Sequence, residues 1–178
     1  IWQAGVLLAA LRERGVSDDS IRKRRLGEDS GRITIPVTNH SGLYVNIRKY
    51  LPGAPGADKF KNLRGHGKLR IYPVDQLAYD QILVCGGEVK AIVAAQELNA
   101  YGIGAITQTG GGGNWDPSLT STLKGKKIWV CMDVDADGEK GSNVVCTHLH
   151  RAASWLGNVR LPLDIDEFPH GDINDYVM

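Results

Sequence analysis

The second half of the chain alternates short apolar runs with segments of helical spacing, and this rhythm limits the folds open to it. Runs typical of buried strands occupy 82–85, 103–107, 128–132 and 159–163. Helical spacing joins two sets of apolar residues, namely Ala91, Ala94, Ala95 and Leu98, and then Val144, Val145, Leu149, Ala153 and Leu156. Strand–helix alternation predicts βαβ units, and hence an α/β fold whose parallel sheet is flanked by helices.

The first half predicts a smaller α+β subdomain. Ser17 is a suitable N-cap for a short helix. Two strands are expected at 32–37 and 44–48, on either side of a polar turn. This organisation predicts a basic N-terminal subdomain of residues 1–80 and a second subdomain of residues 81–178.

Charge is distributed unevenly over these two subdomains. Residues 1–80 contain 14 Lys and Arg against 8 Asp and Glu, whereas residues 81–178 contain 7 against 12, although the net charge of the chain is only +1. A basic half joined to an acidic half suits a protein that holds a polyanion with one half and metal ions with the other.

Composition narrows the class of protein further. No apolar run is long enough to span a bilayer and no signal peptide is present, so we expect a cytoplasmic location and no membrane partner. Because the chain begins at Ile1 rather than Met, it is expected to be an excised fragment. Cys85, Cys131 and Cys146 lack the spacing of a metal site, so we expect reduced, buried thiols.

The strongest candidate site is the run Asp133-Val134-Asp135-Ala136-Asp137-Gly138. It follows an apolar strand, and ligands of open parallel sheets bind beyond the carboxyl ends of the strands. Alternate residues of an extended segment point the same way, so Asp133 and Asp135 can face one site. Carboxylate oxygens, together with water and substrate phosphates, are what Mg²⁺ prefers. Gly138 is expected to let the chain turn close to the ligand and enter the next helix.

Two other interpretations of this run need no magnesium. An acidic loop that caps the following helix stays open as an alternative. An EF-hand calcium loop would place Asp133, Asp135 and Asp137 at its first, third and fifth positions, but Val144 stands at the twelfth, where a glutamate is required. The EF-hand is therefore excluded.

Three further segments are candidates for the same site. The glycine run 110–113 can cradle a phosphate or serve as a flexible connector, and it is not a Walker loop because no Gly-Lys-Ser/Thr follows. Segment 86–91 follows the first apolar run. The polar tail 170–175 can join the metal site or cap a short helix.

In order and spacing, these motifs resemble the Toprim domain shared by bacterial-type and phage primases, topoisomerases and some nucleases. That family has a Glu-Gly motif after its first strand and an Asp-x-Asp motif after a later one. The run from Asp133 to Gly138 matches the second motif, and Gly87 and Ala91 match the surroundings of the first. The segment Asp172-Ile173-Asn174-Asp175 resembles the Asp-x-Asn motif common in those primases.

The first half resembles the basic subdomain that precedes Toprim in the same primases, so the resemblance covers nearly the whole chain. Arg14-Gly15-Val16-Ser17 is similar to a junction between two helices, and Lys59-Phe60-Lys61-Asn62 to a segment that contacts nucleic acid or nucleotide. Contacts to template or triphosphate are accordingly expected from Arg32, Arg48, Lys59, Lys61, Asn62 and Arg64. Phe60 and Trp115 are expected either to stack on a base or to pack in the core.

The sequence departs from the family at the first acidic motif. The family's glutamate falls at Gly86 and its aspartate at Lys90, which leaves Glu88 as the acidic residue there. Glu88 can reach the site from the next turn, the substitution can disable the site, or the protein can be a binding-only relative. Lys90 is either a fixed cation beside the aspartate pair or a surface lysine of the helix.

The resemblance implies a DNA primase, a nucleotidyltransferase that synthesises short RNA primers on single-stranded DNA during replication. Transfer would use two ions of Mg²⁺ or Mn²⁺. The implied catalytic residues are Glu88, Asp133 and Asp135, and the implied metal ligands are Asp133, Asp135 and Asp172. The rival interpretations are a Toprim nuclease and a degenerate nucleic-acid-binding accessory protein.

The resemblance also implies partners and an origin. Single-stranded DNA template, ribonucleoside triphosphates and a replicative helicase are the expected partners. The compact domain favours a phage- or plasmid-encoded protein of a bacterial cell. The primases of this family usually carry an N-terminal zinc ribbon, but the sequence has no four-ligand Cys/His cluster, so the ribbon is expected upstream of Ile1 or is absent.

Overall fold

The computed structural model describes residues 6–111 and 113–178, and the chain divides into two compact units, Ile1–Lys68 and Leu69–Met178. The boundary thus lies before residue 69 rather than near residue 80. β5 (Ile71–Tyr72) pairs with β7 (Ile103–Gln108) of the second unit, and η1 (Val74–Ala78) also packs against β7. Residues 69–80 therefore belong to the second unit.

The first unit is built on an antiparallel sheet of four strands in the order β1-β2-β3-β4. Along β2 the residues Ile33, Ile35 and Val37 are fully buried while their neighbours are only partly so, which is the period-two pattern of a sheet with one core face. Ser17 accepts a hydrogen bond from the Ser20 amide, which confirms the expected N-cap. The elements are α1 (Val6–Arg12), α2 (Asp18–Lys23), β1 (Gly27–Asp29), β2 (Arg32–Thr38), β3 (Tyr44–Tyr50), α3 (Gly56–Lys59) and β4 (Phe60–Asn62).

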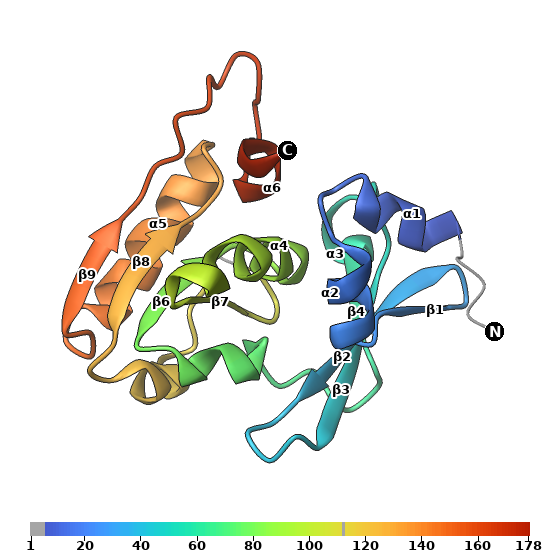
Figure 1. The fold of residues 1–178 in the computed structure, drawn as a ribbon, viewed down its shortest axis with the longest axis horizontal. Coiled ribbons are helices and arrows are strands. Elements are labelled where there is room, and N and C mark those ends of the chain that lie inside the picture. Colours follow the sequence, from blue (N-terminus) through green and yellow to red (C-terminus); the bar gives the residue numbers. More distant parts are fainter. Residues whose placement is uncertain (1–5, 112) are drawn as a thin grey trace. The chain divides into compact units, whose positions relative to one another are not determined.

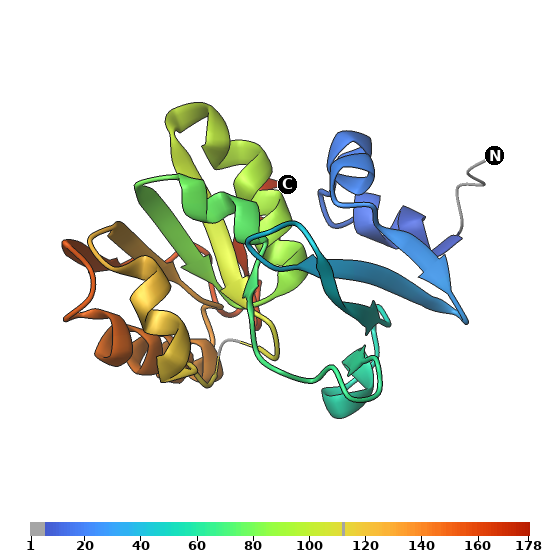
Figure 2. The same ribbon diagram turned by 90° about the horizontal axis from the view of Figure 1, so that it is seen from below.

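The second unit contains a five-stranded sheet in the order β5-β7-β6-β8-β9 (Figures 1 and 2). β6, β7, β8 and β9 are parallel, and β5 runs antiparallel to β7 at the edge, so the predicted α/β class is confirmed. Besides β5, η1 and β7, the elements are β6 (Gln81–Cys85), α4 (Glu88–Leu98), η2 (Asn99–Tyr101), η3 (Pro117–Leu123), β8 (Lys127–Cys131), α5 (Ala136–Leu149), β9 (Trp155–Asn158) and α6 (Ile173–Val177).

Helices cover both faces of this sheet. On one face, the strand residues Ile82 and Val130 pack with Val145 and Leu149 of α5. On the other face, Leu83 and Cys131 pack with α4 and with Ile173 of α6. The strands are buried on both sides, which explains why they are continuous apolar runs rather than alternating ones.

The order of the strands creates a switch point between β6 and β8. From β6 the chain crosses to β7 on one side, whereas from β8 it crosses to β9 on the other side. Cys85 and Cys131 are paired at the ends of the two strands, so Gly86, one residue after β6, and Asp133, two residues after β8, emerge at the same edge. In open α/β sheets this is where ligands bind.

Two expectations about the end of the chain are wrong. α5 ends at Leu149, and the last strand is Trp155–Asn158 rather than 159–163. Ala153 and Leu156 pack on the same core as α5, but they do so from the connecting segment and from β9. Their apolar character therefore reflects burial in the same core, and it does not indicate a continuous helix.

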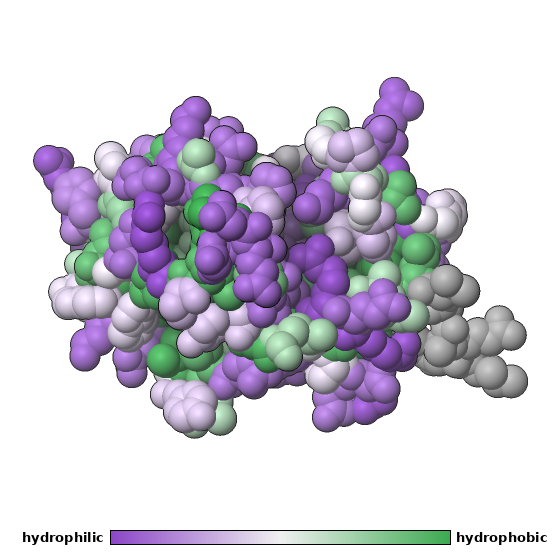
Figure 3. All heavy atoms as spheres, turned by 90° about the horizontal axis from the view of Figure 1, so that it is seen from above, coloured by the Kyte–Doolittle hydropathy of each residue, from purple (hydrophilic) through white to green (hydrophobic). Residues whose placement is uncertain are grey.

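No helix among the described residues is long and apolar enough to cross a membrane. Hydrophilic residues occupy most of the molecular face drawn in Figure 3, with smaller hydrophobic areas between them.

The three cysteines differ in exposure, and this predicts their reactivity. Burial raises the pKa of the Cys85 thiol, and it raises the pKa of Cys131 to about 11. Cys146 is only half-buried. In native protein at pH 8, a chromogenic disulfide reagent should therefore modify Cys146 first and reach the other two only after unfolding in urea. Rapid labelling of all three thiols in the native protein would contradict this packing.

Candidate functional site

The aspartate run forms a tight loop between β8 and α5. Asp135 is the N-cap of α5, and its Oδ1 accepts a hydrogen bond of 2.7 Å from the Gly138 amide. A Cβ atom at position 138 would lie 2.1 Å from the Asp133 carbonyl oxygen, so this position requires glycine. The close approach is to the chain itself, so Gly138 shapes the loop that carries both aspartates. Helix capping is thus confirmed for Asp135, in addition to its place at the site.

The C-terminal tail is tied to this loop. The Val134 amide donates to the Gly171 carbonyl at 2.9 Å, and His170 Nδ1 lies 2.6 Å from Asp135 Oδ2. Asp172 caps α6 through a hydrogen bond from the Asn174 amide at 2.7 Å. The tail therefore caps a short helix and also contacts the aspartate loop, and its part in a metal site stays a prediction.

Lys90 connects the two aspartate segments. Its Nζ lies 2.5 Å from Asp133 Oδ1 and 3.1 Å from Asp172 Oδ2. The Lys90 side chain is only 12% exposed and that of Asp172 only 8%. Of the two alternatives for Lys90, the structure therefore excludes the surface lysine and shows a fixed cation beside the aspartate pair.

Burial and ion pairing determine the charges of these groups. Burial alone would lower the pKa of Lys90, but Asp172 and Asp133 outweigh it and the pKa is raised. Burial raises the pKa of Asp133, against the opposing effect of Lys90. The hydrogen bond from the Gly138 amide, followed by that from His170, lowers the pKa of Asp135. Lys90 is therefore protonated and Asp135 is ionised at neutral pH.

A cavity of about 470 Å³ opens beside the aspartate loop. Asp133 and Asp135 face it from the carboxyl edge of the sheet, and it extends to the loop after β7. The glycine run of that loop is only partly described, because Gly112 lies outside the described residues. The lining residues are Gly86, Gly113, Asn114, Met132, Asp133, Asp135, Asp137, Gly138, Lys140 and Gly141.

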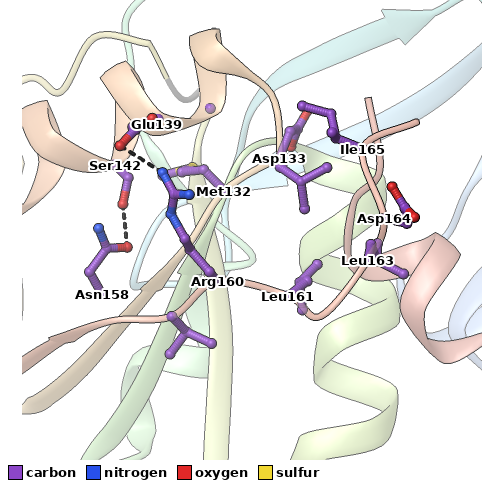
Figure 4. A pocket seen from close by; sticks show the side chains of 13 residues that line it. Met132, Asp133, Glu139, Ser142, Asn158, Arg160, Leu161, Leu163, Asp164 and Ile165 are labelled. Atoms are coloured by element: carbon purple, nitrogen blue, oxygen red, sulfur yellow. Dashed lines mark hydrogen bonds and ion pairs between the residues drawn. The ribbon is translucent and has the colours of Figure 1, made fainter. Parts of the chain in front are cut away.

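A second cavity, of about 370 Å³, lies on the β9 side of Asp133 (Figure 4). One wall is the segment after β9, with Leu161 and Leu163, and the other is the first half of α5. Arg160 pairs with Glu139 across it at 2.6 Å. Sequence reasoning missed this cavity, although its residues follow β9 and so belong to the same carboxyl edge. Asp133 therefore borders both cavities.

The departure from the family pattern at position 86 affects the space beside Asp133. A Cβ atom on Gly86 would lie 3.4 Å from Asp133 Oδ1, so a longer side chain there would begin beside that carboxylate. Glu88 is buried in the first turn of α4 with 1% exposure. Among the described residues that line the two cavities, Glu88 is not found. The structure therefore brings Asp133, Asp135, Asp172 and Lys90 together, and leaves a catalytic role of Glu88 a prediction.

The donor set suits a magnesium ion that keeps water or phosphate ligands. The described residues contain no group of three or more His, Cys, Asp or Glu side chains arranged to hold a metal ion. Mg²⁺ is usually bound by one or two carboxylates plus water and substrate phosphates rather than by a complete protein cage. Asp133 and Asp135, at the edge of an open cavity, fit that pattern.

In the first unit, two of the predicted nucleic-acid contacts are held within the sheet. Arg48 is only 4% exposed, donates to Asn62 Oδ1 at 3.0 Å and lies over the Phe60 ring at 4.8 Å. Phe60 also stacks on Tyr50, so its ring is engaged in packing. Trp115, in the second unit, is buried and belongs to the core.

The remaining basic candidates lie at the surface of the first unit. Arg32 donates to the Asp58 carbonyl at 2.8 Å, and Lys61 pairs with the Asp58 carboxylate at 2.9 Å. Lys59 and Arg64 are exposed. Lys61 is exposed as well, so Lys59, Lys61 and Arg64 are all accessible to a polyanion.

Comparison with solved structures shows that the fold is that of bacterial and phage primase catalytic cores, as the motif resemblance predicted. The zinc-binding and RNA polymerase domains of Aquifex aeolicus primase superimpose with a TM-score of 0.71 and 15% identity, over 90% of this chain and 51% of that one. The chain thus spans about half the length of that Aquifex structure. No protein-family model matches the sequence, and no curated protein matches it significantly.

Two further structures are similar over most of this chain. The primase fragment of the bacteriophage T7 primase-helicase protein has a TM-score of 0.62 and 18% identity, over 98% of this chain and 72% of that one. The DnaG primase catalytic domain bound to single-stranded DNA has a TM-score of 0.63 and 14% identity, over 93% and 70%.

The pairing of Asp172 with Lys90 predicts two separable losses of stability. Asparagine is also a good N-cap, so Asp172→Asn removes the charge but keeps the cap. We expect it to lower the free energy of unfolding by about 1–2 kcal/mol, less than the roughly 3–5 kcal/mol of breaking a buried pair outright, because Asp133 stays on Lys90. Asp172→Ala should lose about 1 kcal/mol more for the cap. Equal urea midpoints for wild type and Asp172→Asn would contradict the ion pair.

Proposed function

We propose that this chain is the nucleotidyl-transfer domain of a primase, which joins ribonucleotides into short RNA primers on single-stranded DNA. One observation carries the proposal: Asp133 and Asp135 lie together at the switch point of a primase-like sheet, beside an open cavity. In the proposed reaction, a ribose 3′ hydroxyl attacks the α-phosphate of a nucleoside triphosphate and diphosphate leaves.

The residues of the site have different parts in this reaction. Asp133 and Asp135 would hold Mg²⁺ or Mn²⁺, which when bound stabilises negative charge on the reacting phosphate oxygens. The Gly138 amide and His170 orient Asp135, and Lys90 orients Asp133. Asp172 acts through Lys90, which makes it a positioning residue in this proposal.

The first unit would hold the template. Single-stranded DNA is bound mainly through its phosphates, and exposed Lys and Arg side chains supply the opposite charge. Lys59 and Arg64 are the proposed contacts, with Arg32 and Lys61 beside Asp58. The T7 structure is a fragment of a primase-helicase protein, which supports a replicative helicase as a proposed partner.

A binding-only accessory protein is the second candidate, favoured by Gly86 and Lys90 at the positions of the family's carboxylates. A Toprim nuclease would use the same aspartates. The three functions differ in what happens to labelled nucleic acid, so one assay separates them.

Primer synthesis is tested with labelled ribonucleoside triphosphates, a single-stranded template and Mg²⁺ or Mn²⁺. We expect short labelled RNA from the wild type and none from Asp133→Asn, since the amide loses the charge that holds the cation. Glu97→Gln, an exposed charge change on α4, should retain activity. Circular dichroism establishes that both variants are folded.

The other outcomes of this assay are equally informative. Template loss without synthesis would identify the nuclease, and template binding alone the accessory protein. Full activity of Asp133→Asn would refute the assignment of the site.

Template binding by the first unit predicts a steep dependence on salt. The logarithm of the binding constant should fall linearly with the logarithm of salt concentration, with a slope near −0.7 per phosphate contacted. The double variant Lys59→Ala/Arg64→Ala should flatten that slope by about 1 to 1.5. Lys124→Ala, an exposed lysine of the second unit, is the control and should leave it unchanged. If the affinity for single-stranded DNA did not depend on salt concentration, this surface would not be the one that binds the template.

A further inference from the structure

Lys90 occupies the space between two of the three carboxylates that the proposed function relies on. Its Nζ contacts Asp133 Oδ1 and Asp172 Oδ2 at the distances of direct ion pairs, 2.5 and 3.1 Å. The side chain reaches this position from the first turn of α4, and it is almost fully enclosed. An ammonium group held in this way is a permanent part of the site.

This ammonium keeps a metal ion out of the gap between Asp133 and Asp172. Mg²⁺ requires oxygen ligands at about 2.0–2.1 Å and cannot share the Asp133–Asp172 gap with a cation that already fills it. Outside that gap, Asp133 and Asp135 both line the cavity of about 470 Å³, whereas the cavity of about 370 Å³ is bordered by Asp133 without Asp135.

The charges of the site agree with this geometry. Asp133, Asp135 and Asp172 with Lys90 carry a formal charge of −2, which one divalent ion neutralises. A glutamate at 86 and an aspartate at 90 would bring the same group to −5, a charge that calls for more than one divalent ion. Gly86 places no side chain beside Asp133, so the second carboxylate of a paired site is missing at the same point.

We propose that this site binds a single divalent metal ion, between Asp133 and Asp135, and that the Lys90 ammonium takes the place of a second one. The Lys90 ammonium thus supplies a positive charge that, in a two-metal mechanism, would come from a second metal ion bound from solution. The inference rests on the proposed function only in taking the aspartate loop as the reaction centre. Lys90 is a positioning residue in this scheme, because it holds Asp133 and Asp172 in place.

The test counts metal ions on the nucleotide-free full chain with Mn²⁺ as the probe, by electron paramagnetic resonance and by calorimetry. We expect one Mn²⁺ per wild-type chain. The double variant Gly86→Glu/Lys90→Asp, which restores both carboxylates, should bind two. Lys140→Met removes an exposed lysine that lines the same cavity, and this control should still bind one.

A second variant serves if the double variant does not fold. Lys90→Met keeps the length of the side chain without its charge, and leaves Asp133 and Asp172 uncompensated. Mn²⁺ should therefore raise the midpoint of thermal unfolding of Lys90→Met more than that of the wild type, since an ion bound only to the native state stabilises it.

Several results would overturn the inference. These are two equivalent Mn²⁺ ions or none on the wild type, an unchanged count in the double variant, an equal thermal shift with and without Lys90, and an increased count in Lys140→Met. The count needs no substrate, so it is independent of primer synthesis. A chain that makes no primers but binds one Mn²⁺ refutes only the proposed function, and an active chain that binds two refutes only this inference.

Discussion

The site depends on the ion pairs of Lys90 with Asp133 and Asp172. These three residues come from the first turn of α4, the loop after β8 and the cap of α6, so one ammonium group joins three separate segments. Asp172 is buried and Asp133 is partly buried, and each would carry an uncompensated charge without Lys90. The same interaction therefore stabilises the tail against the sheet and sets the charge of the candidate reaction centre.

The sheet explains why a short loop can carry this site. β6 and β8 are adjacent and parallel, and their crossovers leave in opposite directions, so the space beyond their ends stays open. Asp135 then serves two purposes, because the carboxylate that caps α5 also faces the cavity. Gly138 is required by the backbone of this loop, because a side chain there would collide with the backbone of Asp133. Primase catalytic cores share this fold at very low sequence identity, so the same arrangement of strands and loops forms from largely different side chains.

Local patterns predicted much of the fold. The strand runs at 82–85 and 103–107, the cap at Ser17 and the strand-end position of Asp133 follow from periodicity and capping chemistry. The predictions were wrong where the same sequence pattern can arise from two different structures. Ala153 and Leu156 continue the helical spacing of α5 but are buried from other elements, and residues 69–80 join the second unit through β5, a strand of two residues.

The sequence alone determined the α/β class and placed the aspartate pair at a strand end, because strand–helix alternation and the order of residues along a strand are local properties. It also showed that Gly86 and Lys90 depart from the family pattern. Only the tertiary structure decided what Lys90 does, since its partners lie 43 and 82 positions further along the chain. Whether a lysine is a solvated surface group or a buried counter-ion depends on which distant carboxylates the fold brings to it, and that information is not present in its neighbours in sequence.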